Sequence, residues 1–272
     1  MRKPIALLLA SFLAACDGSS VEPPLRPSYH ATFKDGSLDC CIHIDKIHAP
    51  AKVPLEKGQS GVSEIAQWTE GHGTLALMLT APMAIAEDAN PSMGIFSTGL
   101  DFGQGKVFLV RATFQRPRAV AGPFNGWAVG VVARTGGKDD RFAEKRLGVT
   151  LTFKNGSAEV RFREGDKTAS SIKFGPDHED VYNKIMNDAQ PFTLELWVDR
   201  KAGRSAARLI TRGGFSPRID VDPSVFKADD GPPITAVGAT LANCCNEGKQ
   251  VSVEVKDFQI WEAGRQLPQN RP

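Results

Sequence analysis

Alternation of apolar and polar residues is the feature of this sequence that most restricts its fold. In the segment 75–80, leucines occupy positions 75, 77 and 79, and Ala76, Met78 and Thr80 alternate with them. A period of two is that of a β-strand with one face buried. Similar runs recur at 108–115, 127–134, 147–153, 158–164, 192–199, 206–211, 235–242 and 251–261.

A single segment, 177–189, has the pattern of a helix. Asp177 can cap its first turn, and Val181, Ile185 and Met186 lie on one side of the helix expected there. One isolated helix among many strands predicts an all-β fold.

Two local features predict how particular strands pair. Asn155-Gly156 favours a two-residue type I′ turn, because both central positions of that turn need positive φ. In the last strand, the valines at 251, 253 and 255 are in one phase, whereas Phe258 and Ile260 are in the other, so we expect a bulge near Lys256-Asp257. The apolar pairs that the Asn155-Gly156 turn predicts are Phe153 with Ala158, Leu151 with Val160 and Val149 with Phe162.

The C-terminal half contains the segment Phe192-Thr193-Leu194-Glu195-Leu196-Trp197-Val198-Asp199, a turn at 201–203, the strand 207–210 and the closing run 253–261. In these stretches the chain resembles the concanavalin-A-like family of jelly-roll sandwiches, which includes lectins, laminin-G-like modules and laminarinase-type hydrolases. The resemblance covers 30–262 as a pattern of strands. It implies an antiparallel two-sheet jelly-roll sandwich and a bias toward glycans, and it names no activity.

The N-terminus has the pattern of an export signal. Arg2 and Lys3 precede an apolar run, 5–15, which is too short to span a bilayer and has the length of a signal-peptide core. The run ends in Leu13-Ala14-Ala15-Cys16, which resembles the lipobox of bacterial lipoproteins and implies that Cys16 becomes the lipidated N-terminus. The alternative is an ordinary secretory signal in which Cys16 is incidental.

We therefore expect four parts: a signal peptide at 1–15, a flexible tether at 16–27, one β-sandwich domain at 28–264 and a short tail at 265–272. The resemblance implies a protein anchored in the bacterial cell envelope that faces the periplasm or the exterior. Asp17 resembles a retention signal for the inner membrane in enteric bacteria, and the leaflet stays open. Removal of the signal peptide leaves 31 basic and 31 acidic residues, which argues against a nucleic-acid partner.

The other four cysteines form two adjacent pairs, Cys40-Cys41 and Cys244-Cys245. In an oxidising compartment they are first interpreted as disulfide partners, and a link from one pair to the other is less strained than a bond between neighbours. The connectivity is not determined. The alternative is a zinc or copper site, because Cys40, Cys41, His43, Asp45 and His48 lie within nine residues.

A second metal hypothesis concerns a long loop, 213–233. Its carboxylates have no fixed ligand spacing, so a structural calcium ion there is a weak candidate, and we otherwise expect no cofactor. The four candidate ligands are Asp220, Asp222, Asp229 and Asp230.

Binding of a carbohydrate is the favoured function. If Phe192, Leu194 and the following apolar residues are buried, Glu195 and Trp197 share the opposite face, where an exposed indole could stack on a sugar and a carboxylate could accept its hydroxyl hydrogen bonds. The alternative is that Trp197 belongs to a secondary core. Further candidates on the expected floor of such a groove are Arg111, Thr113, Gln115, Arg134, Thr150 and Thr152.

The remaining tryptophans are interpreted from their positions in the strands. Trp68 is a second candidate for an exposed aromatic on a loop or strand edge, whereas Trp127 and Trp261 begin and end strands and are expected to pack.

Catalysis has less support, since the chain lacks the strand of three alternating acids found in laminarinase-type hydrolases and any Gly-x-Ser-x-Gly motif. The favoured interpretation is a lipid-anchored, non-catalytic carbohydrate-binding protein. A glycoside hydrolase or polysaccharide lyase on the same scaffold, or an envelope lipoprotein that docks a protein partner, remains open.

Overall fold

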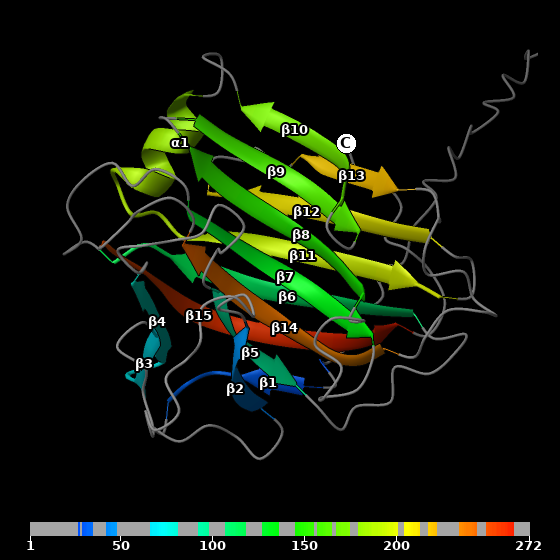
Figure 1. Cartoon of the computed structure of the whole chain (residues 1–272), viewed down its shortest axis with the longest axis horizontal. Coiled ribbons are helices and arrows are strands. Elements are labelled where there is room, and N and C mark those ends of the chain that lie inside the picture. The colour runs from blue at the N-terminus through cyan, green and yellow to red at the C-terminus, as the bar shows by residue number, and fades with distance from the viewer. Residues whose placement is uncertain are drawn as a thin grey trace, which may run out of the picture.

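Two antiparallel sheets packed face to face make up the described part of the protein (Figure 1). The computed structural model describes residues 27, 29–34, 42–47, 66–80, 92–97, 107–117, 127–135, 145–154, 157–164, 167–174, 179–200, 204–212, 217–221, 234–243 and 249–263. Every strand pairing within these ranges is antiparallel, as the predicted sandwich requires.

The first sheet has eight strands and contains both the first and the last strand of the described chain. Its order is β13-β12-β11-β6-β15-β4-β3, and β1 pairs with β15 beside this path. The strands are β13 (Arg218–Val221), β12 (Arg204–Thr211), β11 (Phe192–Asp199), β6 (Val107–Gln115), β15 (Gln250–Ala263), β4 (Thr74–Thr80), β3 (Ala66–Gly71) and β1 (Tyr29–Ala31).

The second sheet has seven strands in the order β10-β9-β8-β7-β14-β5-β2. It lies in front of the first sheet in Figure 1. The strands are β10 (Lys167–Phe174), β9 (Ser157–Glu164), β8 (Lys145–Lys154), β7 (Trp127–Thr135), β14 (Ile234–Asn243), β5 (Ser92–Ser97) and β2 (Ile42–Ile47).

The core fills the space between the sheets, and its residues come from alternate positions of nearly every strand. Leu75, Leu77 and Leu79 are buried on β4, as the period of two predicts. Trp127 packs in this core with its ring stacked on that of Phe153, at 4.4 Å between centroids. Burial of one face of each strand on a common apolar layer is the main favourable term in such a fold.

The predicted β8–β9 hairpin is confirmed. Phe153 is aligned with Ala158, Leu151 with Val160, and Val149 with Phe162. All six side chains are buried. The turn chemistry and the alternation had specified the same register because a shift by one residue would turn every apolar side chain to the wrong face.

The predicted bulge in the last strand is also confirmed. The register of β15 against β6 shifts between Val255 and Asp257. The side chains of Val255, Phe258 and Ile260 are all buried as a result. The extra residue reverses the phase of the strand, so Asp257 and Gln259 face outward.

The predicted helix is shorter than expected and lies at one end of the sandwich as α1 (Glu179–Met186). Ile185 and Met186 are buried, as the pattern predicted. The buried Arg116 guanidinium donates a hydrogen bond to the carbonyl of Met186 in the last turn of the helix. This contact satisfies a carbonyl that has no partner within the helix.

Several predictions fall outside the described residues. They concern the signal peptide, Cys16, the tether, the tail and all four paired cysteines. Within the described ranges, no helix is long and apolar enough to cross a membrane.

Ile42 and Asn243, which adjoin the two cysteine pairs in sequence, belong to strands on either side of β5. The predicted link between the pairs stays a prediction, because all four cysteines lie outside the described residues.

Candidate functional site

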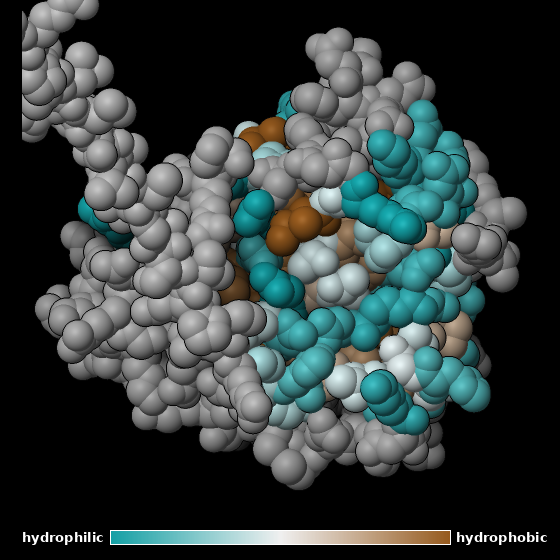
Figure 2. Space-filling model, turned by 180° about the vertical axis from the view of Figure 1, so that it is seen from behind, coloured by the Kyte–Doolittle hydropathy of each residue, from teal (hydrophilic) through white to brown (hydrophobic). Residues whose placement is uncertain are grey.

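Most of the candidate binding residues predicted from the sequence lie on the outer face of the eight-stranded sheet. The central strands β11, β6 and β15 are neighbours, and Glu195 is aligned with Arg111, which is aligned in turn with Gln259. These residues alternate with core residues and therefore face away from the other sheet. Figure 2 shows this face, where hydrophilic side chains surround a paler and partly apolar area.

Arg111 is the centre of the arrangement. Its Nε donates a hydrogen bond to Glu195 Oε1 at 2.7 Å, and a second guanidinium nitrogen forms an ion pair with the same oxygen. Its Cζ lies 4.8 Å from the ring centroid of Trp261. A guanidinium between a carboxylate and an indole is held from two sides, so its remaining donors have a fixed direction.

Trp261 was expected to be a packing residue, and this expectation is incomplete. Its indole packs beside Arg111 but is only half-buried. The bulge at position 256 turns Trp261 to the outer face, since it puts this residue in phase with Gln259. The phase reversal that predicted the bulge would also have predicted that Trp261 faces outward.

Trp197 lies on the predicted face, but the expectation that its indole stands in water is wrong. Its exposed fraction is 5%, and it packs with Val107, Ala206 and the partly buried Leu109 in a small cluster outside the main core. Leu109 and Ala206 are the residues aligned with Trp197 on the two neighbouring strands. An apolar residue on each side covers the ring, as the secondary-core alternative predicted.

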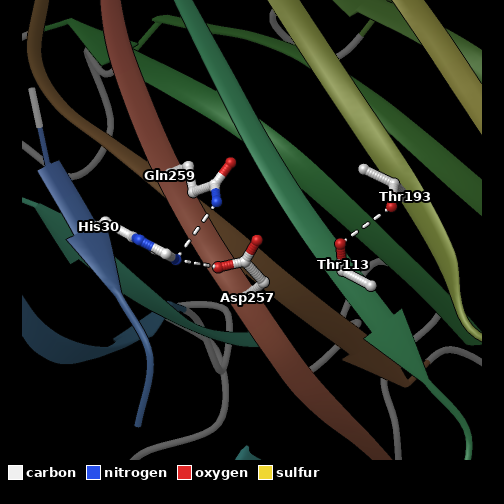
Figure 3. A network of polar contacts seen from close by, with 5 residues as sticks. All are labelled: His30, Thr113, Thr193, Asp257 and Gln259. Carbon is white, nitrogen blue, oxygen red and sulfur yellow. Dashed lines mark hydrogen bonds and ion pairs between the residues drawn. The ribbon is translucent and has the colours of Figure 1, made fainter. Parts of the chain in front are cut away.

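Gln115 and Thr113 share the outer face, but each already has a partner. Gln115 Nε2 donates a hydrogen bond to the Ala189 carbonyl at 2.9 Å and so holds the segment after α1. The hydroxyl oxygens of Thr113 and Thr193 are 2.9 Å apart (Figure 3). Gln115 therefore has a structural contact in place of the expected open position in a groove.

Arg134, Thr150 and Thr152 do not share a groove with Trp197, which corrects the expectation that they extend its floor. Arg134 belongs to β7, and the two threonines belong to β8. Both strands are in the seven-stranded sheet. The core separates them from the Arg111 side of the molecule, and no local pattern in the sequence indicates which strands share a sheet.

Trp68 is exposed, as the sequence suggested. It lies on β3, the end strand of the eight-stranded sheet, and its exposed fraction is 42%. Two strands, β4 and β15, separate β3 from β6. Trp68 therefore belongs to a different part of the surface from Arg111.

The metal hypotheses receive no support within the described ranges, where no group of three or more His, Cys, Asp or Glu side chains converges. Asp220 lies on β13, whereas Asp222, Asp229 and Asp230 are outside the described residues. His43 and Asp45 lie on β2.

A second outer face belongs to the seven-stranded sheet, and its chemistry differs. Glu159 accepts a hydrogen bond from Arg161 at 2.7 Å. Burial by itself raises the pKa of the Glu159 carboxyl, but hydrogen bonds from Arg161 and Ser171 and the charges of Arg161 and Lys173 hold that pKa below its ordinary value. Among the described residues of this face, Gly238 lies directly under the ring of Phe96.

No protein-family model matches the chain, and no curated protein matches it. Solved structures do. The chain is similar to the CBM2 module of the evolved Dit of Lactobacillus casei BL23 phage J-1, at a TM-score of 0.59 and 10% identity over 89% of this chain and 98% of that one. It is similar to the Lotus tetragonolobus seed lectin, at 0.56 and 9% over 88% and 99%, and to the endo-1,3-beta-glucanase of Streptomyces sioyaensis, at 0.53 and 13% over 89% and 98%.

The fold is a concanavalin-A-like jelly roll. This confirms the fold predicted from the strand pattern. At 9% to 13% identity the likeness extends to the backbone arrangement, and the same jelly roll serves a lectin and a glucanase.

Proposed function

We propose that this protein is a lipid-anchored, non-catalytic carbohydrate-binding protein of the bacterial envelope, and that the sugar binds on the outer face of the eight-stranded sheet. The observation that carries the proposal is the position of Arg111 between Trp261 and Glu195. These three side chains combine a half-buried aromatic surface with a guanidinium whose donors are held in place by the buried Glu195 carboxylate. A neutral, polyhydroxylated ligand requires this combination.

The rigidity of the site supports binding. β11, β6 and β15 are interior strands of the sheet, with paired neighbours on both sides. Side chains on such strands lose little conformational entropy when a ligand arrives, and this lowers the cost of binding. The contact between Arg111 and Glu195 further restricts both side chains.

The arrangement of acids favours binding over hydrolysis. Retaining glycosidases need two carboxyl groups about 5 Å apart, one of them free to give up a proton. Glu195 is engaged by Arg111, and Asp257, the acid aligned with Thr113, is engaged by His30. Neither carboxylate contacts the other among the described hydrogen bonds.

The solved structures and the N-terminal sequence support two further parts of the proposal. The lectin and the carbohydrate-binding module named above share the jelly roll, so this scaffold is compatible with a sugar ligand. The lipobox-like sequence that ends in Cys16 supports the anchor.

The binding site is tested with the exported full chain, extracted in mild detergent, by retention on polysaccharide affinity gels. Trp261→Ala and Arg111→Leu are expected to lose at least about tenfold in affinity, because each removes a central contact of the proposed site. Trp68→Ala is the matched control, because it removes an indole that is exposed elsewhere. Equal retention of wild type and Trp261→Ala would count against this site, and loss in Trp68→Ala would move it to β3.

The anchor is tested separately by metabolic labelling with an alkyne fatty acid in the native host. We expect label on the wild type and none on Cys16→Ser. Absence of label on the wild type would support the alternative that the N-terminus is an ordinary secretory signal. Release of sugar or of unsaturated products from a polysaccharide panel would replace binding with catalysis as the function.

A further inference from the structure

Two rows of outward side chains cross the eight-stranded sheet at the proposed sugar site. From β13 to β15, the aligned residues of the first row are Arg218, Arg208, Glu195, Arg111 and Gln259. The second row lies two residues further along each strand, at a distance of about 7 Å. From β12 to β15, its residues are Ala206, Trp197, Leu109 and Trp261. One row is polar and mostly charged, and the other is apolar.

The charged row contains more positive than negative groups. It holds three arginines and one carboxylate, and this carboxylate, of Glu195, is buried and paired with Arg111. The Arg111 side chain remains 35% exposed. The other described acid that faces outward on β11, Asp199, is aligned with a further arginine, Arg204. The positive excess is local, because residues 16–272 carry 31 basic and 31 acidic side chains in all.

The alignment of Arg208 with Arg218 is unfavourable by itself. Like charges on directly opposed positions of neighbouring strands destabilise a sheet. Arg208 is exposed and Arg218 is partly exposed, so an anion from outside the protein can reach both. Each guanidinium carries five N–H donors, which is more than a single contact within the protein uses. An anionic group between the two would replace their repulsion by charge-assisted hydrogen bonds.

We propose that the ligand on this face is an acidic polysaccharide, which crosses the strands from β15 to β13 with its carboxylate or sulfate groups on an arginine row of Arg111, Arg208 and Arg218. This inference rests on the proposed function, because a neutral ring of the same polymer is the sugar at Trp261. Arg111 and Arg208 are two strands apart, about 10 Å. This separation is close to the length of an extended disaccharide, so a polymer with one acidic sugar in each disaccharide would present successive anions to them.

The apolar row favours a polysaccharide over a small anion. Leu109 and Trp261 are partly exposed in this row, beside the buried Trp197 and Ala206. The C–H faces of sugar rings pack on such a surface, while acidic substituents on the same rings reach the neighbouring arginine row. Figure 2 shows hydrophilic side chains around the paler, partly apolar area of this face. An inorganic anion would use the arginines and leave the apolar row without a role.

The test compares retention of the full chain, extracted in mild detergent, on gels of hyaluronate and of carboxyl-reduced hyaluronate. The two polymers have the same alternating backbone and differ in the charge of one sugar in each disaccharide. We expect binding to the acidic form to be at least about tenfold tighter at low salt and to weaken as sodium chloride screens the charges. Alginate and polygalacturonate, each beside its carboxyl-reduced form, complete the panel.

Paired variants assign the charge effect to the arginine row. Arg208→Gln combined with Arg218→Gln should weaken binding to the acidic form by about tenfold or more and leave binding to the reduced form unchanged. The matched control combines Arg161→Gln with Lys173→Gln, which removes two positive charges from the other sheet and should leave both affinities unchanged. Trp261→Ala should weaken binding to both forms alike, because it removes the surface for the neutral ring.

The outcomes separate this inference from the proposed function. Equal retention on acidic and reduced gels that is lost in Trp261→Ala would overturn the acidic ligand and leave the sugar site in place. Retention on acidic gels that survives in Trp261→Ala but is lost in the arginine variant would support the arginine row and overturn the site at Trp261.

Three further results would overturn the inference. The first is an equal loss of retention in the control variant, since binding would then follow total charge. The second is retention on none of the acidic gels. The third is binding to phosphatidylglycerol vesicles in place of the polysaccharides, which would assign the arginine row to a lipid surface.

Discussion

The two sheets bury the same kinds of residue on their inner faces but differ on their outer faces. The eight-stranded sheet packs large side chains against one another on its outer face, such as Trp197 beside Leu109 and Arg111 beside Trp261. On the outer face of the seven-stranded sheet, position 238 is instead a glycine without a side chain, so that Phe96 lies against the backbone there. Both Trp197 and Phe96 are buried.

Burial outside the main core therefore arises in two ways in this protein. On one sheet, apolar neighbours on adjacent strands cover a large ring. On the other, an absent Cβ lets a ring pack against the backbone of the strand beside it. An aromatic residue on an outward position is therefore no sign of a binding surface until its neighbours are known.

The largest expected effect is on Trp197. Trp197→Ala should lower the free energy of unfolding by about 4 kcal/mol, because it empties a buried indole site. The paired substitution Trp68→Ala should change it by no more than about 0.5 kcal/mol, since that indole is exposed on an end strand. Urea unfolding followed by circular dichroism measures both. An equal loss of unfolding free energy in the two variants would show that the outer face around Trp197 is not a packed layer.

The close packing against Gly238 on the seven-stranded sheet is tested by adding a methyl group at this position. A Cβ on Gly238 would lie 2.2 Å from the Ile95 carbonyl oxygen and 2.5 Å from Phe96 Cδ1. Gly238→Ala should therefore cost about 3 kcal/mol, because the carbonyl belongs to the strand paired with β14 and has little freedom to move.

Gly73→Ala separates this steric cost from the cost of backbone conformation. Gly73 has a φ of 76°, and the nearest atom to an added Cβ is 3.8 Å away. It should cost about 1 kcal/mol, from the left-handed backbone alone. Thermal unfolding of the two variants side by side would contradict the close-contact explanation if Gly73→Ala were the more damaging.

The smallest expected effect is the pH dependence contributed by Glu159. Its folded-state pKa lies below the ordinary value of 4.5, so folding favours the carboxylate. This contribution is complete above that ordinary value and is lost as the pH falls through the lowered pKa. Wild type should therefore exceed Glu159→Gln in stability at pH 7, and the difference should shrink below pH 4.5. Urea midpoints over this range measure it, and a difference that grows on acidification would reverse the sign assigned here.

The parts of the fold that could be predicted from the sequence are those that local patterns specify. Asn155-Gly156 and the alternation on both sides of it specified the β8–β9 register, and the phase change after position 255 specified the bulge. Both predictions depend on residues within a few positions of each other. The same information placed Glu195 and Trp197 on an outward face, which the structure confirms.

The candidate site depended on contacts that no local pattern contains. The burial of Trp197, the stacking of Arg111 on Trp261 and the assignment of Arg134 to the other sheet all follow from which strands are neighbours. His30 and Gln259 come together across almost the whole chain.

Local alternation specifies which side chains of each strand face the core, because a strand exposes alternate residues to opposite sides whatever lies next to it. Which outward side chains touch one another follows only from the pairing of strands in the folded protein. That choice is made when distant strands pair, since a residue on one strand is covered, paired or left in water by residues that the chain supplies from far away.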